Sequence, residues 1–285
     1  MTKGVLLFAN NNESIDYVTQ AYQLAKRINQ YLNLPTSIVT TDKNYLQKTF
    51  SDYDEVFDEI IETDQELVKN NRVYHDGIAS NQILNFRNNL RPYAYDLSPY
   101  DSTIVMDVDY IICSDHLSKC FDQTEDFLIY KDGTYLGIDE KYTKEFSYVS
   151  DGGIDFYWAT VVYFEKTKKN NVFFELLKHI QDNWYHYVLL YKLPNTMYRN
   201  DFAFSIAIHI MNDYGSLDMF KTMPTSILYT LDVDILHSIK NDVLILLTGK
   251  QGHPGEYVAH RTQGLDVHVM NKFSLDRLYK GEQHV

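Results

Sequence analysis

Two aspartates separated by one residue, Asp107 and Asp109, carry the clearest chemical signal in this 285-residue chain. They follow Ser102–Met106, a run of β-branched and apolar residues that predicts a buried strand. Two uncompensated carboxylates at the end of such a strand are costly, and a divalent cation, which prefers oxygen ligands, would offset that cost. In open α/β sheets this end of the strands borders the ligand crevice. The pattern therefore predicts a metal site that binds a diphosphate.

The alternative is a pair of ordinary loop acids, because Asp-x-Asp occurs by chance in acidic chains. A second copy, Asp232-Val233-Asp234, is interpreted as such a chance occurrence. The strand before Asp107 is what separates the first copy from the second.

The net charge of −13 argues against a broad nucleic-acid surface, because DNA binding draws on Lys and Arg at the phosphates. The charge is uneven: residues 1–165 carry 27 acidic and 13 basic side chains, and residues 166–285 carry 12 and 13. The sequence contains no run of about 18 apolar residues, so no membrane span is expected. The apolar run at the N-terminus is too short for a signal peptide. Two cysteines make no disulfide framework, so we expect a cytoplasmic protein.

The elements that must position the two aspartates follow an α/β pattern. Strand, helix and strand are expected at 4–9, 15–32 and 36–41, which is a βαβ unit. Residues 52–66 fit a strand edge or an exposed helix. Further along the chain, helices are expected at 78–95, 172–191 and 201–211, and strands at 102–106, 157–164, 226–231 and 243–247. The pattern predicts one α/β domain whose mixed, mainly parallel central sheet is flanked by helices.

Residues 97–112, LSPYDSTIVMDVDYII, resemble the metal-site segment of GT-A glycosyltransferases of the glycogenin and bacterial galactosyltransferase type. Residues 1–42 are similar to the nucleoside-binding opening of that family, and 157–191 to a later strand-and-helix segment. The resemblance implies a single Rossmann-like GT-A domain over 1–285. Residues 1–112 would bind the nucleotide sugar and the metal. Residues 113–285 would bind the acceptor and end in a metal- and diphosphate-binding segment.

The same resemblance implies the activity and its ligands. It implies a hexosyl- or pentosyltransferase that moves a sugar from a nucleoside-diphosphate sugar, of the UDP type, to an acceptor hydroxyl with Mn²⁺ or Mg²⁺. His268-Val269-Met270-Asn271-Lys272 looks like the family's C-terminal segment. His268 would be a third metal ligand beside Asp107 and Asp109, and Lys272 would meet the diphosphate. The alternative for His268 is an ordinary core or surface histidine.

The resemblance also implies ligand-binding roles for other residues, and each of them has a structural role as its alternative. Asn10 and Asn11 would lie under the nucleoside or form a turn, and Asp42 would accept from the base or ribose or end a strand. Arg87 would bind sugar or phosphate or lie exposed on a helix. Asp201 would contact the acceptor hydroxyl or cap the helix that follows it.

Two departures from the glycogenin-like pattern bear on stereochemistry. Trp158-Ala159-Thr160 stands where that pattern carries Asn-Ser-Gly, and Phe202 follows Asp201 where it favours Gln. The missing amide puts a retaining mechanism in doubt. It leaves open Asp201 as a general base for inversion.

The sequence leaves the acceptor open between a carbohydrate, a small molecule and DNA. Residues 166–199 hold six basic and two acidic side chains, a stretch that would suit a polyanion. The Asn- and Tyr-rich style resembles proteins of T4-like bacteriophages, some of which glycosylate hydroxymethylated cytosines in their DNA; the protein would then act in the host cytoplasm. The alternatives to a glycosyltransferase are a metal-dependent nucleotidyltransferase or phosphotransferase and a non-catalytic binding protein. The oligomeric state is left open.

Overall fold

The computed structural model describes residues 1–63, 70–87, 89–137, 146–150, 153–250, 253 and 255–281. Within these residues a seven-stranded sheet forms the centre of the molecule. Its strands follow the spatial order β11 (Lys221–Thr222), β8 (Phe127–Tyr130), β10 (Trp158–Glu165), β6 (Ser102–Met106), β1 (Lys3–Phe8), β2 (Thr36–Thr40) and β3 (Glu59–Glu62). Strand β10 pairs antiparallel with both neighbours, and the remaining pairs are parallel. The predicted mixed, mainly parallel sheet is confirmed.

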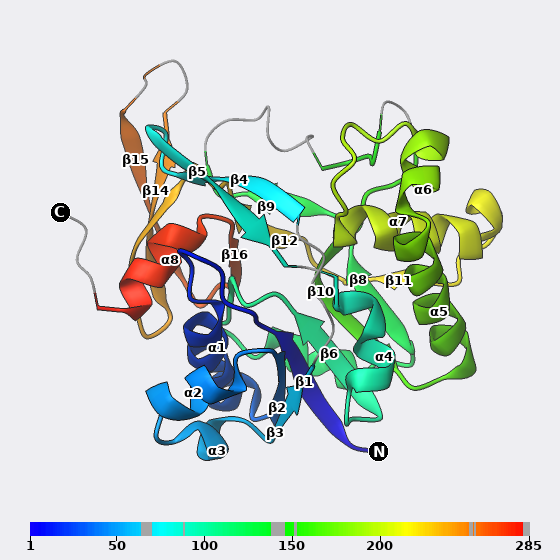
Figure 1. Ribbon diagram of the computed structural model, residues 1–285, viewed down its shortest axis with the longest axis horizontal. Coiled ribbons are helices and arrows are strands. Elements are labelled where there is room, and N and C mark those ends of the chain that lie inside the picture. Colours follow the sequence, from blue (N-terminus) through cyan, green and yellow to red (C-terminus); the bar gives the residue numbers. More distant parts are fainter. Residues whose placement is uncertain are drawn as a thin grey trace.

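Helices flank this sheet on both sides (Figure 1). In that view α1 (Tyr17–Leu32), α2 (Lys43–Thr49) and α3 (Tyr53–Val56) lie to the left of the strands. To the right lie α4 (Ala94–Leu97), α5 (Lys168–Asp182), α6 (Trp184–Tyr191) and α7 (Asn200–Met211). Short 3₁₀ turns occur at Arg91–Tyr93, His116–Asp122 and Asp213–Gly215. Among the described residues, no helix combines the length and the apolar character needed to cross a membrane.

Smaller sheets connect the C-terminal part of the chain to the end of β6. One has the order β7 (Tyr110–Ile111), β16 (Val267–Val269), β12 (Ile227–Thr230), β9 (Gly133–Tyr135). A second contains β13 (Ile235–Lys240), β14 (Val243–Gly249) and β15 (Tyr257–Gln263), and helix α8 (Lys272–Tyr279) packs on β13. The last is a hairpin of β4 (Asn70–Asp76) and β5 (Ser80–Phe86). Because β16 pairs with β7, the chain after residue 266 lies directly beside the two aspartates.

The main hydrophobic core draws on both proposed halves of the chain, from Val5 to Leu231. All five residues of β6 are buried, as a strand in the middle of a sheet covered on both faces requires. A smaller core lies between β14, β16 and α8 and includes Leu246, Val267 and Leu275. The single-domain organisation over 1–285 stays a prediction.

The helix predicted at 78–95 is wrong. Residues 80–86 pair antiparallel with 70–76, and Gly77 supplies the positive φ of +71° in the turn. Leu84 and Tyr74 pack with Ile15 and Phe273. Pairing with a strand and packing against residues far along the chain outweigh the helical spacing of a few apolar side chains.

Two other expectations need smaller corrections. The helix expected at 172–191 starts earlier and divides at Asn183 into α5 and α6. Residues 52–66 were expected to form a strand edge or an exposed helix, and each occurs in part of the segment. Residues of α3 form a short helix, and β3 is an edge strand of the central sheet. Residues 64–66 lie outside the described residues.

Gly4 in β1 illustrates how tightly the central sheet is packed. A Cβ atom at this position would overlap the ring of Tyr100, which is 4% exposed and is hydrogen-bonded to Ser37 at 2.7 Å. We expect Gly4→Ala to lower the free energy of unfolding by about 1–3 kcal/mol, the usual cost of overpacking. Urea denaturation would measure it, with Lys3→Ala in the same strand as an exposed control expected to cost about 0.5 kcal/mol or less. Equal stability of the two variants would contradict this account of the packing.

Candidate functional site

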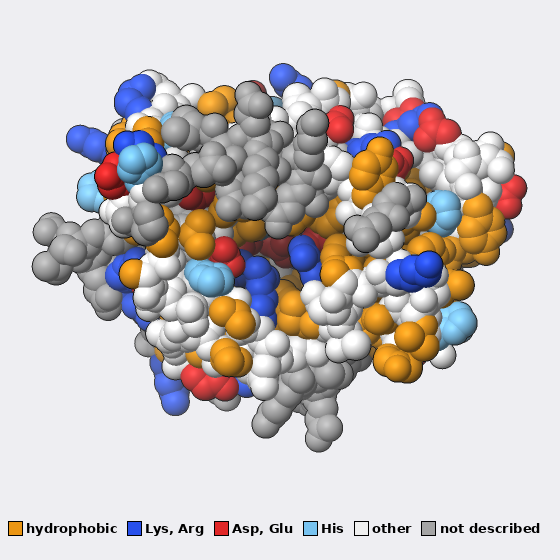
Figure 2. All heavy atoms as spheres, turned by 90° about the horizontal axis from the view of Figure 1, so that it is seen from above, with side chains coloured by type: hydrophobic (Ala, Val, Ile, Leu, Met, Phe, Trp, Pro, Cys, Tyr) orange, Lys and Arg blue, Asp and Glu red, His pale blue; other side chains and the backbone are white. Residues whose placement is uncertain are grey.

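A cavity of about 310 Å³ opens where the carboxyl end of β6 meets β16, α7 and the β4–β5 hairpin. Figure 2 shows it as a hollow near the middle of one face, with acidic and basic side chains at its floor and edge. Its charged lining comes from segments spread over almost the whole chain. These residues are Arg72, Arg87, Arg91, Asp107, Asp109, Arg199, Asp201, Asp232, His268 and Lys272.

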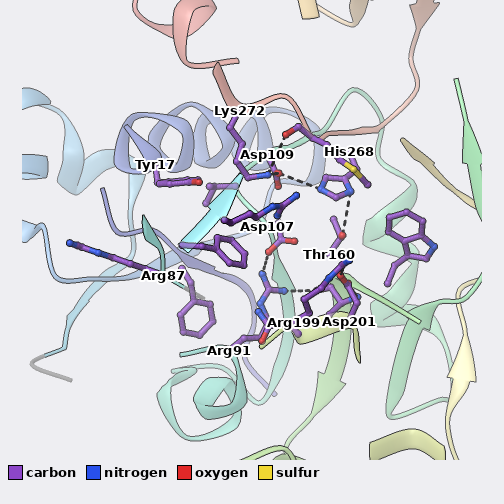
Figure 3. A pocket seen from close by; sticks show the side chains of 18 of the residues that line it. Tyr17, Arg87, Arg91, Asp107, Asp109, Thr160, Arg199, Asp201, His268 and Lys272 are labelled. Carbon is purple, nitrogen blue, oxygen red and sulfur yellow. Dashed lines mark hydrogen bonds and ion pairs between the residues drawn. The ribbon is translucent and has the colours of Figure 1, made fainter. Parts of the chain in front are cut away.

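Asp107, Asp109 and His268 each bring one potential ligand atom to a common point, with all three atoms within 4.8 Å of one another (Figure 3). The two aspartates lie in the turn between β6 and β7. His268 lies opposite Tyr110 on β16, and the Val269 amide donates to the Asp109 carbonyl at 2.9 Å. The β7–β16 pairing therefore creates the cluster.

Contacts at both ring nitrogens orient the imidazole of His268. Its Nδ1 lies 3.4 Å from the hydroxyl of Thr160 on β10, and its Nε2 lies 3.4 Å from Asp109 Oδ2. With a cation bound, a proton on Nδ1 directed at Thr160 would leave the Nε2 lone pair for that cation. His268 is 7% exposed, so its contacts with Thr160 and Asp109 are buried.

Asp109 is 3% exposed and ionised. Burial favours its neutral form, but the ammonium group of Lys272, at 2.5 Å, and the neighbouring His268 outweigh burial and hold the pKa of Asp109 well below its usual range. Lys272 is the first residue of α8 and is itself buried. The Lys272 contact explains how a carboxylate is kept charged at this depth.

Asp107 has the opposite tendency. Burial raises its pKa to about 6, against the effect of the Arg91 guanidinium, which contacts Oδ1. Arg91 is 4% exposed and also donates to the Ala159 carbonyl at 2.6 Å. The Asp107 side chain remains 39% exposed toward the cavity, so one face of this carboxylate is available to a ligand.

These residues fit a divalent cation. Two carboxylates and one imidazole form a mixed oxygen and nitrogen donor set of the kind that Mn²⁺ accepts, and oxygen ligands also suit Mg²⁺. Burial and the neighbouring Asp109 both raise the pKa of Asp107, while Arg91 lowers it. A cation at the common point would add to the effect of Arg91.

The remaining predicted residues divide into two groups. Asn10, Arg87 and Asp201 line the cavity together with Asp107, Asp109, His268 and Lys272. Asn11 and Asp42 are not among the lining residues: the Asn11 amide donates to Asp42 at 2.7 Å, and the Asn11 side chain accepts from Val18 at 2.9 Å. Their contacts join the loop after β1 to the start of α1 and the end of β2.

Asp201 is not the helix cap that was considered as its alternative. Arg199 occupies the cap position, and Asp201 is the second residue of α7. Its Oδ1 accepts from the Ala159 amide at 2.9 Å, and Oδ2 pairs with Arg199 at 3.1 Å. These contacts hold the carboxylate at the cavity wall beside the strand that carries Thr160.

Sequence reasoning missed Arg72, Arg91 and Asp232. Arg91 precedes the aspartates by a spacing that no motif marks, and Arg72 lies in a hairpin whose first strand was not predicted. Asp232 was set aside as part of a chance pattern, but it lines the cavity. Its partner Asp234 is structural, since it accepts from the amides of Leu231 at 2.8 Å and Gly249 at 3.1 Å.

Replacing Arg91 by alanine would leave the Asp107 carboxylate without its cationic partner. We expect the free energy of unfolding to fall by about 2 kcal/mol, less than the 3–5 kcal/mol typical of fully buried pairs, because the Asp107 side chain is partly exposed. Lys221→Ala, which breaks an exposed pair with Asp218, is the control and should cost about 1 kcal/mol at most. Chemical denaturation that ranks the two variants in the reverse order would contradict the role given to Arg91.

No protein-family model matches the chain. No curated protein matches it either. Among solved structures, the glycosyltransferase GlyE of Streptococcus pneumoniae TIGR4 is 12% identical with a TM-score of 0.44, and the match covers 79% of this chain and 46% of GlyE. The galactosyltransferase LgtC, solved with donor and acceptor sugar analogs, is 12% identical with a TM-score of 0.43, covering 71% of this chain and 69% of LgtC. Bifunctional IspDF from Campylobacter jejuni is 14% identical with a TM-score of 0.35, covering 74% and 47%.

The chain spans less than half the length of GlyE and of IspDF. All three TM-scores lie below 0.5, and all three sequence identities lie below 15%.

Proposed function

We propose that the protein is a metal-dependent glycosyltransferase that moves a sugar from a nucleoside-diphosphate sugar to an acceptor hydroxyl. The observation that carries the proposal is the convergence of Asp107, Asp109 and His268 at the end of β6, with Lys272 against Asp109. This set combines a cation site with a positively charged group suited to a diphosphate.

A bound Mn²⁺ or Mg²⁺ would supply Lewis-acid stabilisation of the diphosphate. Asp107, Asp109 and His268 would hold the cation, and Arg91 fixes the direction of Asp107. Lys272 would bind a diphosphate oxygen and stabilise the negative charge that grows there as the bond to the sugar breaks. The protein's own contribution is thus a set of charges fixed in place before the reaction begins.

The donor would lie along the carboxyl ends of β1 and β6. Asn10 and Asn11 would lie near the nucleoside and Asp42 near its base or ribose, as the family resemblance implies; the UDP type of donor rests on the same resemblance. Arg87 would meet the sugar or a phosphate. Asn10 accepts from the Thr41 amide at 2.7 Å, which ties the ends of β1 and β2 together beneath the cavity.

The acceptor hydroxyl would approach Asp201, which we propose as the general base. Asp232 and the partly buried Phe146 line the same cavity, and an aromatic ring beside a carboxylate is suited to the apolar faces and hydroxyls of a sugar. These residues favour a carbohydrate acceptor.

DNA as an acceptor stays a prediction from the sequence, and the charges do not favour it. Lys169 pairs with Asp126, Lys178 with Asp96 and Glu175, and Arg199 with Asp201. Of the six basic residues in 166–199, Arg199 is the one that lines the cavity. A salt-sensitive shift of hydroxymethylated DNA on a gel would revive this acceptor.

Isothermal titration with nucleoside diphosphates, with and without Mn²⁺, tests the proposal. We expect binding that depends on the metal and slow release of nucleoside diphosphate from a nucleotide sugar. Release of pyrophosphate would favour a nucleotidyltransferase, and donor binding without any hydrolysis would favour a non-catalytic binding protein. Absence of metal-dependent binding by the wild-type protein would contradict the proposal.

A further inference from the structure

Arg72 is a cation of the cavity to which the proposed metal, donor and acceptor contacts give no role. It lies on β4 of the hairpin, opposite Leu84 of β5, and its half-buried side chain lines the cavity together with Lys272, Asp107 and Asp109. Sequence reasoning gave it no function, because the hairpin itself was not predicted.

Two aromatic rings hold the Arg72 side chain. Its guanidinium carbon lies 5.5 Å from the ring centroid of Tyr74 and 5.3 Å from that of Phe86. The Tyr74 hydroxyl is in turn hydrogen-bonded to that of Tyr17 on α1, at 3.2 Å. The position of Arg72 is therefore determined by packing.

The hairpin that carries Arg72 is fastened at its far end. Arg277 of α8 donates to both carboxylate oxygens of Asp76, at 2.6 and 2.8 Å, and the amide of Ile78 in the turn donates to Tyr257 at 3.0 Å. The Arg277 contact attaches the hairpin to the helix that begins with Lys272, and the Tyr257 contact attaches it to β15. Arg72 and Lys272 are thus carried by two elements, the β4–β5 hairpin and α8, that are joined by the Asp76–Arg277 ion pair.

The charge of Arg72 is unmatched within the described residues. Arg91, Arg199 and Lys272 each form an ion pair with an aspartate of the cavity, whereas Arg72 and Arg87 have no carboxylate within ion-pair distance in that part of the chain. Burial raises the pKa of Tyr74, and the nearby cations Lys272 and Arg72 oppose that rise. Arg72 therefore acts on the same region as the Lys272–Asp109 pair.

We propose that Arg72 binds the diphosphate of the donor from the hairpin side while Lys272 binds it from α8. This inference rests on the proposed glycosyl transfer. In that transfer the bond from the anomeric carbon to the diphosphate oxygen breaks, its electron pair stays on that oxygen, and the acceptor oxygen bonds to the anomeric carbon. The acceptor proton passes to Asp201. The leaving diphosphate gains one negative charge, and Arg72 supplies a positive charge that no aspartate already neutralises.

Calorimetric titration of the full chain tests this inference in the presence of Mn²⁺. The probes are UDP, inorganic pyrophosphate, which needs no nucleobase recognition, and uridine, which has no phosphate. Arg72→Gln is expected to weaken UDP and pyrophosphate about 10- to 100-fold, the range for a hydrogen bond to a charged group. It should leave uridine binding unchanged and make the salt dependence of UDP binding shallower. Arg261→Gln, an exposed position on β15, is the matched control and should bind all three like the wild type.

The outcomes separate the two proposals. If the wild type binds neither UDP nor pyrophosphate with Mn²⁺, the proposed function fails. If the wild type binds them and a folded Arg72→Gln binds them equally well, the function stands and the role of Arg72 is overturned. Should Arg72→Gln fail to fold by circular dichroism, Arg72→Met, whose apolar stem can still pack against the two rings, decides by the same criterion.

Discussion

Replacing Asp109 by asparagine is expected to weaken Mn²⁺ binding, and with it metal-dependent UDP binding, by at least about 100-fold. Asp109 lies at the centre of the cluster, because His268 and Lys272 both contact its Oδ2. An asparagine is a poorer ligand for a divalent cation and leaves the buried ammonium of Lys272 without its counter-charge. Titration with Mn²⁺ alone measures the metal affinity, and a thermal melt confirms that the variant is folded.

The chain offers a matched control in its second Asp-Val-Asp sequence. Asp232→Asn makes the same chemical change at the first aspartate of that sequence, at a position that lines the cavity but lies outside the group of Asp107, Asp109 and His268. We expect its Mn²⁺ affinity to stay within about threefold of the wild type. Equal Mn²⁺ affinities of the wild type, Asp109→Asn and Asp232→Asn would show that Asp109 is not a metal ligand.

Replacing Asp201 by asparagine is expected to lower kcat for sugar transfer by about 10²- to 10⁴-fold, the usual contribution of a general base. Donor binding should change little, because Asp201 is not part of the metal cluster. The amide oxygen of asparagine can still accept from Ala159, so the loss of charge, and not the loss of that backbone contact, is what the variant tests. Steady-state kinetics with a saturating donor would separate kcat from KM.

Ser205→Ala is a suitable comparison, because Ser205 lies on the same helix and bonds to the backbone of both Tyr157 and Asp201 without lining the cavity. We expect it to affect stability and leave kcat within about threefold of the wild type. A similar fall in kcat for both variants would mean that Asp201 acts by holding α7 against β10 and not by accepting a proton.

The sequence predicted β6 and its two aspartates because both signals are local. A continuous apolar run followed at once by acidic residues determines a buried strand and the direction in which its end faces. The opening strand, helix and strand were predicted for the same reason. His268 and Lys272 were found through the order of family-like motifs, and the structure places both against Asp109.

The sequence did not reveal the partners that give these residues their chemistry. Lys272 and Asp109 are 163 residues apart, and their contact exists because β16 pairs with β7 and α8 begins directly afterwards. The contact of Arg91 with Asp107, and the packing of Arg72 against two aromatic rings of its own hairpin, likewise depend on how separate strands and turns fold together. The two Asp-Val-Asp sequences are identical, yet one brings both aspartates beside His268, and in the other Asp234 accepts from the backbone amides of Leu231 and Gly249.

Local sequence by itself therefore determined which strand ends in carboxylates, since side-chain alternation and apolar runs act over a few residues. The tertiary structure alone decided which of the described carboxylates have a cationic partner, as Asp107 and Asp109 do, and which cavity cations, such as Arg72, have no carboxylate beside them among the described residues. Those properties depend on burial and on charges a few ångströms away, which belong to residues that the chain brings together only when it folds.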